Sequence, residues 1–286
     1  MPQFNTAADI AAYIQTIYED AMFVAREQNI IAGLITTYSD RTGLASRSSS
    51  EWSSATINTI GESDDLTSQA FNPSVISTLT PVEKGAQFLL TDSRLESDPF
   101  AVQREAALEL GAAMATKIET DVIGNFSSLT GGTVGAAGST FTWTYLANAV
   151  AILRNRKIPP PYFAVLHPYH ALDLGVAVAN MAQSTGQMQT PSAGDGYLGG
   201  GNLGAPLGLA GMFQSANISV DSSDDAVSAV FNPMALALDS RRAPRLEPER
   251  DASRRAWELN MTAVYAHGVW RPTYGVKITA DATTPS

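Results

Sequence analysis

The chain has 286 residues, a formal net charge of −10 at pH 7 and no cysteine. This acidity argues against broad attraction to nucleic acid or to anionic membranes, because both bind basic surfaces. The lack of cysteine excludes disulfide bonds, thiolate catalysis and cysteine-ligated metals. The N-terminus lacks a basic segment followed by an apolar one, and no stretch approaches the ~20 apolar residues of a membrane helix. We therefore expect neither a signal peptide nor a membrane segment.

Residues 6–35 predict an amphipathic helix near the N-terminus. Thr6 followed by Asp9 forms a helix-capping pattern, and apolar side chains recur near a period of 3.6 residues. Charged residues such as Glu19 and Arg26 interrupt this segment, which favours packing on protein over binding to a membrane surface. We expect this arm to pack on the body of its own chain or on a neighbour.

Residues 38–97 predict long extended excursions. The segment is rich in serine and threonine, yet residues 54–60 (SATINTI) and 74–79 (SVISTL) have strand-like composition. A third strand-like run, residues 86–92 (AQFLLTD), follows residues 82–85 (VEKG), which are typical of a turn. Because a two-stranded ribbon is marginally stable alone in water, we expect this segment to lie on another surface, such as that of a neighbouring subunit.

A long helix is predicted over residues 100–126, capped by Asp98 and with Pro99 at its first position. Its apolar stripe comprises Ala107, Leu110, Gly111, Met114, Ile118, Val122 and Phe126. Its opposite face has the charged composition of a solvated side and comprises Arg104, Glu105, Glu109, Lys117 and Glu119.

The remaining chain mixes helix and strand patterns. Helices predicted over residues 143–156 and 168–181 flank a short buried strand over residues 162–166, which indicates an α/β module. Apolar and polar residues then alternate at 259–265 and at 274–278, as in strands with one buried face. Gly268 breaks the first run, so we predict two strands joined through residues 269–272 (VWRP).

Two patterns suggest enzymatic chemistry. His167, His170 and Asp173 are spaced by three, which can bring side chains to one helix face where a divalent metal could bind. However, His167 precedes Pro168 at a predicted helix start, and neither a fourth ligand nor a general base is identifiable, so we interpret the trio as structural. Glycines 194, 196 and 199 match GxGxxG but follow no apolar strand, so we predict a loop without a cofactor.

One charged segment, residues 241–255 (RRAPRLEPERDASRR), suits contact between subunits. The planar guanidinium group pairs well with carboxylates on a facing surface, and this acidic chain offers many of them. The alternative is a solvated loop in which these charges pair internally, with little gain from each exposed pair. The candidates for subunit contact are Arg241, Arg242, Arg245, Arg250, Arg254 and Arg255, together with Glu83 and Lys84.

The order of these features resembles the tailed-bacteriophage major capsid protein family, whose fold encapsulins share. Residues 91–123 (TDSRLESDPFAVQREAALELGAAMATKIETDVI) are similar to its loop-to-spine-helix transition. Residues 161–174 (PYFAVLHPYHALDL) are similar to a strand-to-helix step of the axial domain, and residues 263–281 (AVYAHGVWRPTYGVKITAD) to the closing strands of the peripheral domain.

This resemblance implies an α+β fold with five parts. These are an N-terminal arm (1–41), an extended β-hairpin loop (42–96), a peripheral domain with the spine helix (97–140), an axial α/β domain (141–229) and a return to the peripheral domain (230–286). No cofactor and no enzymatic activity are expected.

The resemblance also implies a function. Copies of the chain would form pentamers and hexamers of an icosahedral virion shell around double-stranded DNA, assembled in the bacterial cytoplasm. Scaffolding, portal or decoration proteins would assist, and contact with the DNA would be weak and non-specific. The alternatives are an encapsulin-like compartment shell and a metal-dependent enzyme using His167, His170 and Asp173.

Overall fold

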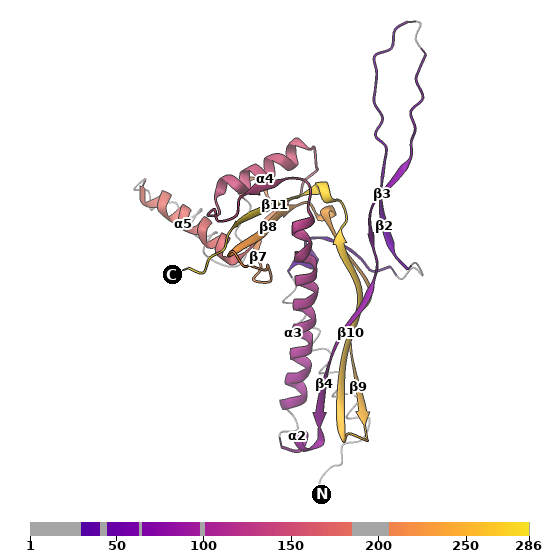
Figure 1. Ribbon diagram of the computed structural model, residues 1–286, viewed down its shortest axis with the longest axis vertical. Helices are drawn as coiled ribbons and strands as arrows, with labels where there is room; N and C mark the ends of the chain where they lie inside the picture. The colour runs from indigo at the N-terminus through magenta and orange to yellow at the C-terminus, as the bar shows by residue number, and fades with distance from the viewer. Residues whose placement is uncertain (1–29, 41–44, 63–64, 98–100, 185–205, 286) are drawn as a thin grey trace.

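The computed structural model describes residues 30–40, 45–62, 65–97, 101–184 and 206–285. In these ranges the chain forms two sheets, three longer helices and a projecting β-hairpin (Figure 1). The helices are α2 (Asp92–Ser97), α3 (Ala101–Ile123), α4 (Trp143–Asn155) and α5 (Pro168–Ser184). The strands are β1 (Thr36–Tyr38), β2 (Arg47–Trp52), β3 (Pro73–Leu79), β4 (Val82–Thr91), β5 (Thr133–Gly135), β6 (Phe163–Leu166), β7 (Gly211–Gln214), β8 (Asp225–Phe231), β9 (Leu236–Asp251), β10 (Ala256–Val269) and β11 (Gly275–Asp281). Among the described helices, none is long and apolar enough to cross a membrane.

The first sheet is a long ribbon with strand order β1-β9-β10-β4. β9 and β10 form an antiparallel hairpin, β4 runs antiparallel along β10, and β1 adds a short parallel edge to β9. Leu259, Met261, Ala263 and Tyr265 alternate along β10 and are buried on the face toward α3. The alternation predicted for residues 259–265 therefore defines the face that the long helix covers.

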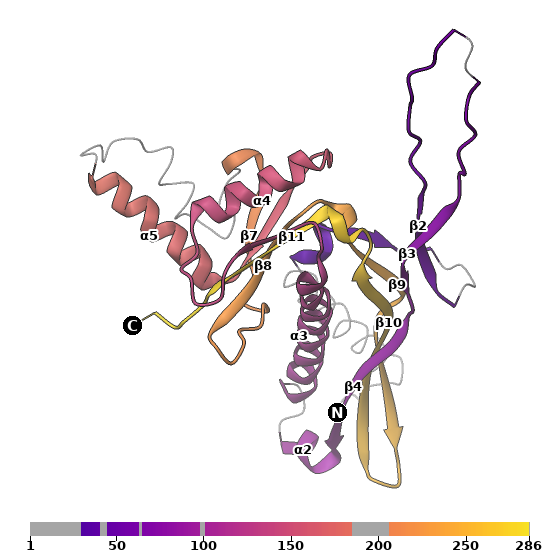
Figure 2. The ribbon, with the colours of Figure 1, turned by 45° about the horizontal axis from the view of Figure 1, so that its top comes forward.

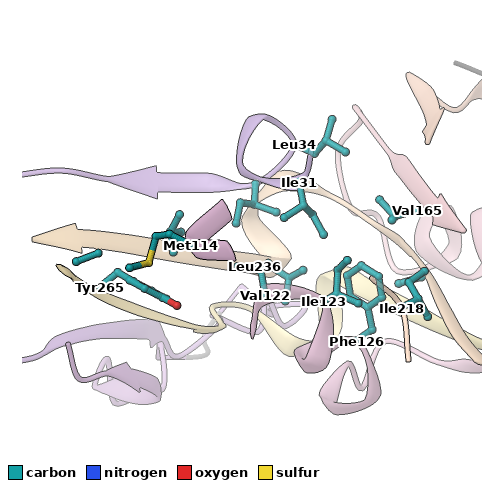
Figure 3. Packing of buried hydrophobic residues seen from close by; sticks show 14 of the residues in the cluster. Ile31, Leu34, Met114, Val122, Ile123, Phe126, Val165, Ile218, Leu236 and Tyr265 are labelled. Atoms are coloured by element: carbon teal, nitrogen blue, oxygen red, sulfur yellow. The ribbon is translucent and has the colours of Figure 1, made fainter. Parts of the chain in front are cut away.

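Helix α3 contributes the predicted apolar stripe to this core. Leu110, Met114, Val122 and the following Phe126 are buried in one cluster with residues of β9 and β10. Figure 3 shows Ile123, Phe126 and Ile218 gathered beside Leu236, where the helix end meets the second sheet. The long helix thus supports both sheets.

The second sheet has strand order β5-β11-β8-β6-β7. Helix α4 packs on one face, where Leu146, Ala149, Val150 and Leu153 join a separate core with residues of β11 and β8. The helices predicted at 143–156 and 168–181 and the strand predicted at 162–166 are confirmed as α4, α5 and β6.

The two predicted C-terminal strands are confirmed as β10 and β11, which are joined through the predicted connection. They do not pair with each other, because β10 belongs to the first sheet whereas β11 pairs with β8 and β5 in the second. Gly268 lies inside β10 and does not end it. Alternation identifies which face of a strand is buried, but it carries no information on the partner strand.

Three further local predictions are corrected. Residues 54–60 form no strand, and residues 82–85 continue β4 instead of turning. A Cβ atom on Gly85 would lie 2.7 Å from the carbonyl oxygen of Met261, so a glycine at this position allows β4 to lie close to β10. Most of the predicted N-terminal helix, residues 6–29, lies outside the described residues, and within them Ile31–Gly33 is a 3₁₀ turn that leads into β1. Asp98 and Pro99 also lie outside them, and the short helix α2 was not predicted.

Glu119 is another exception, because it lies on the expected solvated face of α3 but is only 2% exposed. Its Oε1 accepts a hydrogen bond from Ser215 Oγ at 2.5 Å, while its Oε2 has no hydrogen-bond partner. The loop after β7 covers this side chain, which a helical pattern alone cannot reveal.

Candidate subunit interface

A largely exposed element is the projecting hairpin, which we define as β2, β3 and the described residues between them (Figure 2). Beyond Trp52 its two arms are joined by a Ser53 N–H bond to the Asn72 carbonyl (3.2 Å) and a Thr56 N–H bond to Gln69 Oε1 (2.8 Å). Trp52 and Phe71 stack across the arms with ring centroids 4.7 Å apart. Large apolar side chains are exposed along the hairpin: Trp52, Ile57, Ile60, Leu66, Phe71 and Val75.

The base of the hairpin is anchored to the first sheet. Arg47 Nε lies 3.4 Å from Asp239 Oδ2, and its guanidinium also pairs with Asp40 and lies 4.3 Å from the Tyr38 ring centroid. Asp239 is fully buried and also pairs with Arg241 at 2.9 Å. A buried carboxylate between two guanidinium groups therefore fixes where the hairpin leaves the body.

The arginine-rich segment forms the end of β9 and the turn before β10, so residues 241–251 are strand and not loop, although the internal pairing that the alternative included is observed. Most of its charges pair within the chain. Arg250 makes a bidentate contact with Asp92 (2.6 and 2.7 Å), and Arg242 crosses β10 to pair with Glu83. Arg245 pairs with Glu247 at 3.2 Å.

Two arginines lie at the exposed turn itself. Arg254 is paired with Asp251 and Glu258, both at 3.5 Å, yet its side chain is 64% exposed. Arg255 is exposed and adopts φ 50°. These two side chains project from the far end of the ribbon and are sterically accessible to another molecule.

Lys84 instead faces α3 and binds Asp121. Asp121 also accepts hydrogen bonds from Lys117 (2.8 Å) and from the Tyr265 hydroxyl (2.6 Å). Burial alone would raise the pKa of Asp121, but the hydrogen bonds from Lys117, Lys84 and Tyr265 lower it to about 2. Burial, with the Asp121 carboxylate nearby, raises the pKa of Tyr265. The cluster joins α3 to β4 and β10.

The three candidate metal ligands do not converge. His170 is buried, with Nδ1 2.8 Å from Ser228 Oγ and Nε2 3.2 Å from the Ala280 carbonyl oxygen. Asp173 accepts the Phe141 N–H at 3.2 Å, and His167 Nδ1 accepts the Tyr169 N–H at 3.3 Å. No group of three metal-ligating side chains occurs in the part of the chain that the structure describes. The GxGxxG glycines lie outside that part.

The comparison with known families supplies the decisive observation. Residues 75–278 match the family model described as phage capsid protein. The chain belongs to the phage capsid protein family. A comparison with curated proteins found no match.

Solved structures show that this capsid protein shares the fold of phage capsids. A chain from Mycobacterium phage Che8 is 19% identical with a TM-score of 0.69, covering 88% of this chain and 91% of that one. A chain from the capsid of cyanophage P-SCSP1u is 14% identical with a TM-score of 0.67, covering 87% of both chains. A virus-like particle from Pyrococcus furiosus is 10% identical with a TM-score of 0.61, covering 92% and 98%.

The sequence analysis did not identify Asp239 and Asp121, the two carboxylates that bind several cations in this capsid protein. The arginine-rich segment indicated the cationic partners of several ion pairs, but nothing in the sequence around these two aspartates distinguished them from ordinary helix and strand residues. Each has one partner nearby in sequence, but Arg47 reaches Asp239, and Lys84 and Tyr265 reach Asp121, only when segments distant in sequence pack together.

Proposed function

We propose that this capsid protein is the major head protein of a tailed bacteriophage. Copies of it form pentamers and hexamers that close into an icosahedral shell around double-stranded DNA. The observation that carries the proposal is the projecting hairpin with its exposed apolar side chains, found on a chain of the phage capsid family. Such a ribbon is marginally stable alone, so burial against a neighbouring subunit stabilises it.

The parts of the chain take the roles that the family resemblance implies. Residues 1–41 act as the arm, 42–96 as the extended loop, 97–140 and 230–286 as the peripheral domain, and 141–229 as the axial domain. Among the charged candidates, Arg254 and Arg255 are the side chains that we assign to contacts with neighbours, supported by their exposure at the end of the ribbon. The other six candidates form ion pairs within the chain, and we propose that they support the interface indirectly by fixing the shape of the ribbon: Glu83, Lys84, Arg241, Arg242, Arg245 and Arg250.

The proposed role as a head protein also implies other protein partners and proximity to DNA. Scaffolding, portal and decoration proteins assist assembly in the bacterial cytoplasm, and the chain itself catalyses no reaction. Its net charge of −10 supports weak, non-specific proximity to packaged DNA, since an acidic wall repels phosphates.

The test is to purify the protein, alone and co-expressed with the scaffolding protein of its own phage, and to examine it by light scattering and electron microscopy. Closed shells of uniform size are expected. Protein that stays monomeric at high concentration in both preparations would contradict the proposal. Shells that contain a co-purifying enzyme and no nucleic acid, when isolated from infected cells, would instead indicate a compartment shell.

A further inference from the structure

Charge is segregated along this chain in a way that the fold does not neutralise. Residues 48–81, which make up most of the hairpin, contain Glu51, Glu62, Asp64 and Asp65 and no lysine, arginine or histidine. Glu51, Glu62 and Asp65 are exposed, and no ion pair joins them to another described residue. The hairpin therefore presents uncompensated negative charge beside exposed apolar side chains.

The opposite charge gathers at the C-terminal end of α4. Residues 122–172 contain no aspartate or glutamate, and their cations are Arg154, Arg156 and Lys157. All three are exposed, and none forms an ion pair within the described residues. The helix dipole favours cations at a helix C-terminus, but it does not explain why this stretch of chain contains no acidic residue. Three unpaired cations together contrast with the arginines of β9, which are largely paired.

Exposed apolar side chains lie at the same end of the second sheet as these cations. Arg154 Nη2 donates to the Leu207 carbonyl oxygen at 3.1 Å, and the Leu207 side chain is exposed. Asn232 Nδ2 donates to the Pro159 carbonyl oxygen at 2.9 Å, which brings the exposed Met234 to the same end of the second sheet. We define the basic patch as Arg154, Arg156, Lys157, Leu207, Pro160 and Met234.

We propose that the basic patch receives the acidic hairpin of a second copy of this chain. The two surfaces are complementary, because each combines exposed apolar side chains with charges of one sign. Within one chain they do not meet, since the hairpin projects from the body apart from α4 (Figures 1 and 2). The inference rests on the proposed function, which requires adjacent copies, and it names the surface on which the hairpin lies.

The composition of the patch favours a protein partner over DNA. Binding to a duplex depends on a run of phosphate contacts along a basic face, whereas this patch has three cations among apolar side chains on an acidic chain. Leucine, methionine and proline match the exposed tryptophan, phenylalanine and isoleucine residues of the hairpin instead.

A charge-reversal series tests the contact in the full chain. We expect the triple variant R154E/R156E/K157E and the triple variant E51K/E62K/D65K each to raise the protein concentration needed for half-maximal shell assembly by about tenfold or more. Combining the six changes is expected to restore assembly, because it inverts both surfaces. Far-ultraviolet circular dichroism checks that each variant folds.

Engineered disulfides provide the second measurement, since the chain has no cysteine of its own. The variant E62C/R156C is expected to form disulfide-linked oligomers when assembled shells are oxidised. The matched control E62C/S222C places its second thiol in an exposed loop at the other end of β8 and is expected to stay monomeric on denaturing gels.

The outcomes separate the two proposals. Wild-type protein that never forms shells overturns the proposed function and this contact with it. Wild-type shells whose assembly is unaffected by either reversal, and that give no E62C/R156C oligomers, overturn the contact alone. Normal assembly of R154E/R156E/K157E combined with loss of binding to a short DNA duplex would assign the patch to DNA.

Discussion

At the scale of single residues, the buried His170 and the partly buried Asp121 both have lowered pKa values, each for a different physical reason. His170 lies in the second core with both ring nitrogens in hydrogen bonds, and burial lowers its pKa to about 4. Asp121 lies between α3 and the ribbon, and its cationic and phenolic partners lower its pKa to about 2. Each shift makes stability depend on pH in a defined range.

His170 is expected to make the protein less stable in mild acid. Below pH 6.5 the unfolded chain protonates this histidine while the folded chain does not, so stability falls as the pH drops toward 4, by about 3 kcal/mol. Urea denaturation of monomeric protein between pH 7 and pH 4 measures the slope. The variant H170N loses this proton uptake, so its slope should be shallower than that of wild type, and equal slopes would contradict the prediction.

Asp121 acts in a lower range of pH. Its lowered pKa means that its ion pairs stabilise the fold above about pH 4 and that this contribution disappears as the pH falls to about 2. The variant D121N should therefore lose about 2 kcal/mol at pH 7. The deficit, measured by urea denaturation, should shrink as both proteins are brought toward pH 3. A deficit that is constant with pH would mean that packing, not charge, is lost.

At the scale of elements, the hairpin depends on one buried anchor. Asp239 of β9 holds Arg47 at the start of β2, and the neighbouring Leu79 of β3 packs with Ala237, Ala266 and Trp270. The position of the hairpin thus follows from contacts between segments about 190 residues apart in the chain.

The variant D239N tests this anchor. Removing the buried charge leaves two guanidinium groups without their carboxylate, which should cost about 3 kcal/mol or more and increase proteolytic cleavage within the hairpin. The control D40N removes the exposed partner of Arg47 and should cost less than about 1 kcal/mol. Equal effects of the two substitutions would show that the buried pair is not the anchor. Chemical denaturation and limited proteolysis measure both quantities.

At the scale of the whole molecule, folding and assembly should separate. Trp52 and Phe71 are 54% and 67% exposed, so they contribute little to the monomer, yet they provide apolar area that a neighbour can cover. The double variant W52S/F71S should melt within a few degrees of wild type but assemble far more weakly. The variant W52F/F71Y keeps the stacked pair and should assemble. Light scattering measures the assembly of each variant. Normal shells from W52S/F71S would contradict a role for Trp52 and Phe71 in assembly.

Local sequence patterns predicted most of the helices and strands. Among the errors were the burial and the pairing of charged residues, which depend on long-range contacts. The periodicity of residues 100–126 predicted α3 because helix formation depends on neighbours three and four residues apart. The same pattern misplaced Glu119, which the loop near Ser215 buries. The arginine-rich segment indicated ion pairs, but its partners Glu83 and Asp92 come from β4 and from α2, so they could not be assigned from spacing.

Short-range pattern and the order of the elements were enough to predict the main helices, the buried faces of β10 and β11 and the family to which the chain belongs. Long-range packing was needed to show that β10 and β11 lie in different sheets, that residues 82–85 are strand, and where the hairpin is anchored. It also separated paired from unpaired cations, since Arg154, Arg156 and Lys157 form no ion pair with any acid in the described ranges. Those properties depend on which distant segments meet, and a single sequence encodes that only through the packing of the whole fold.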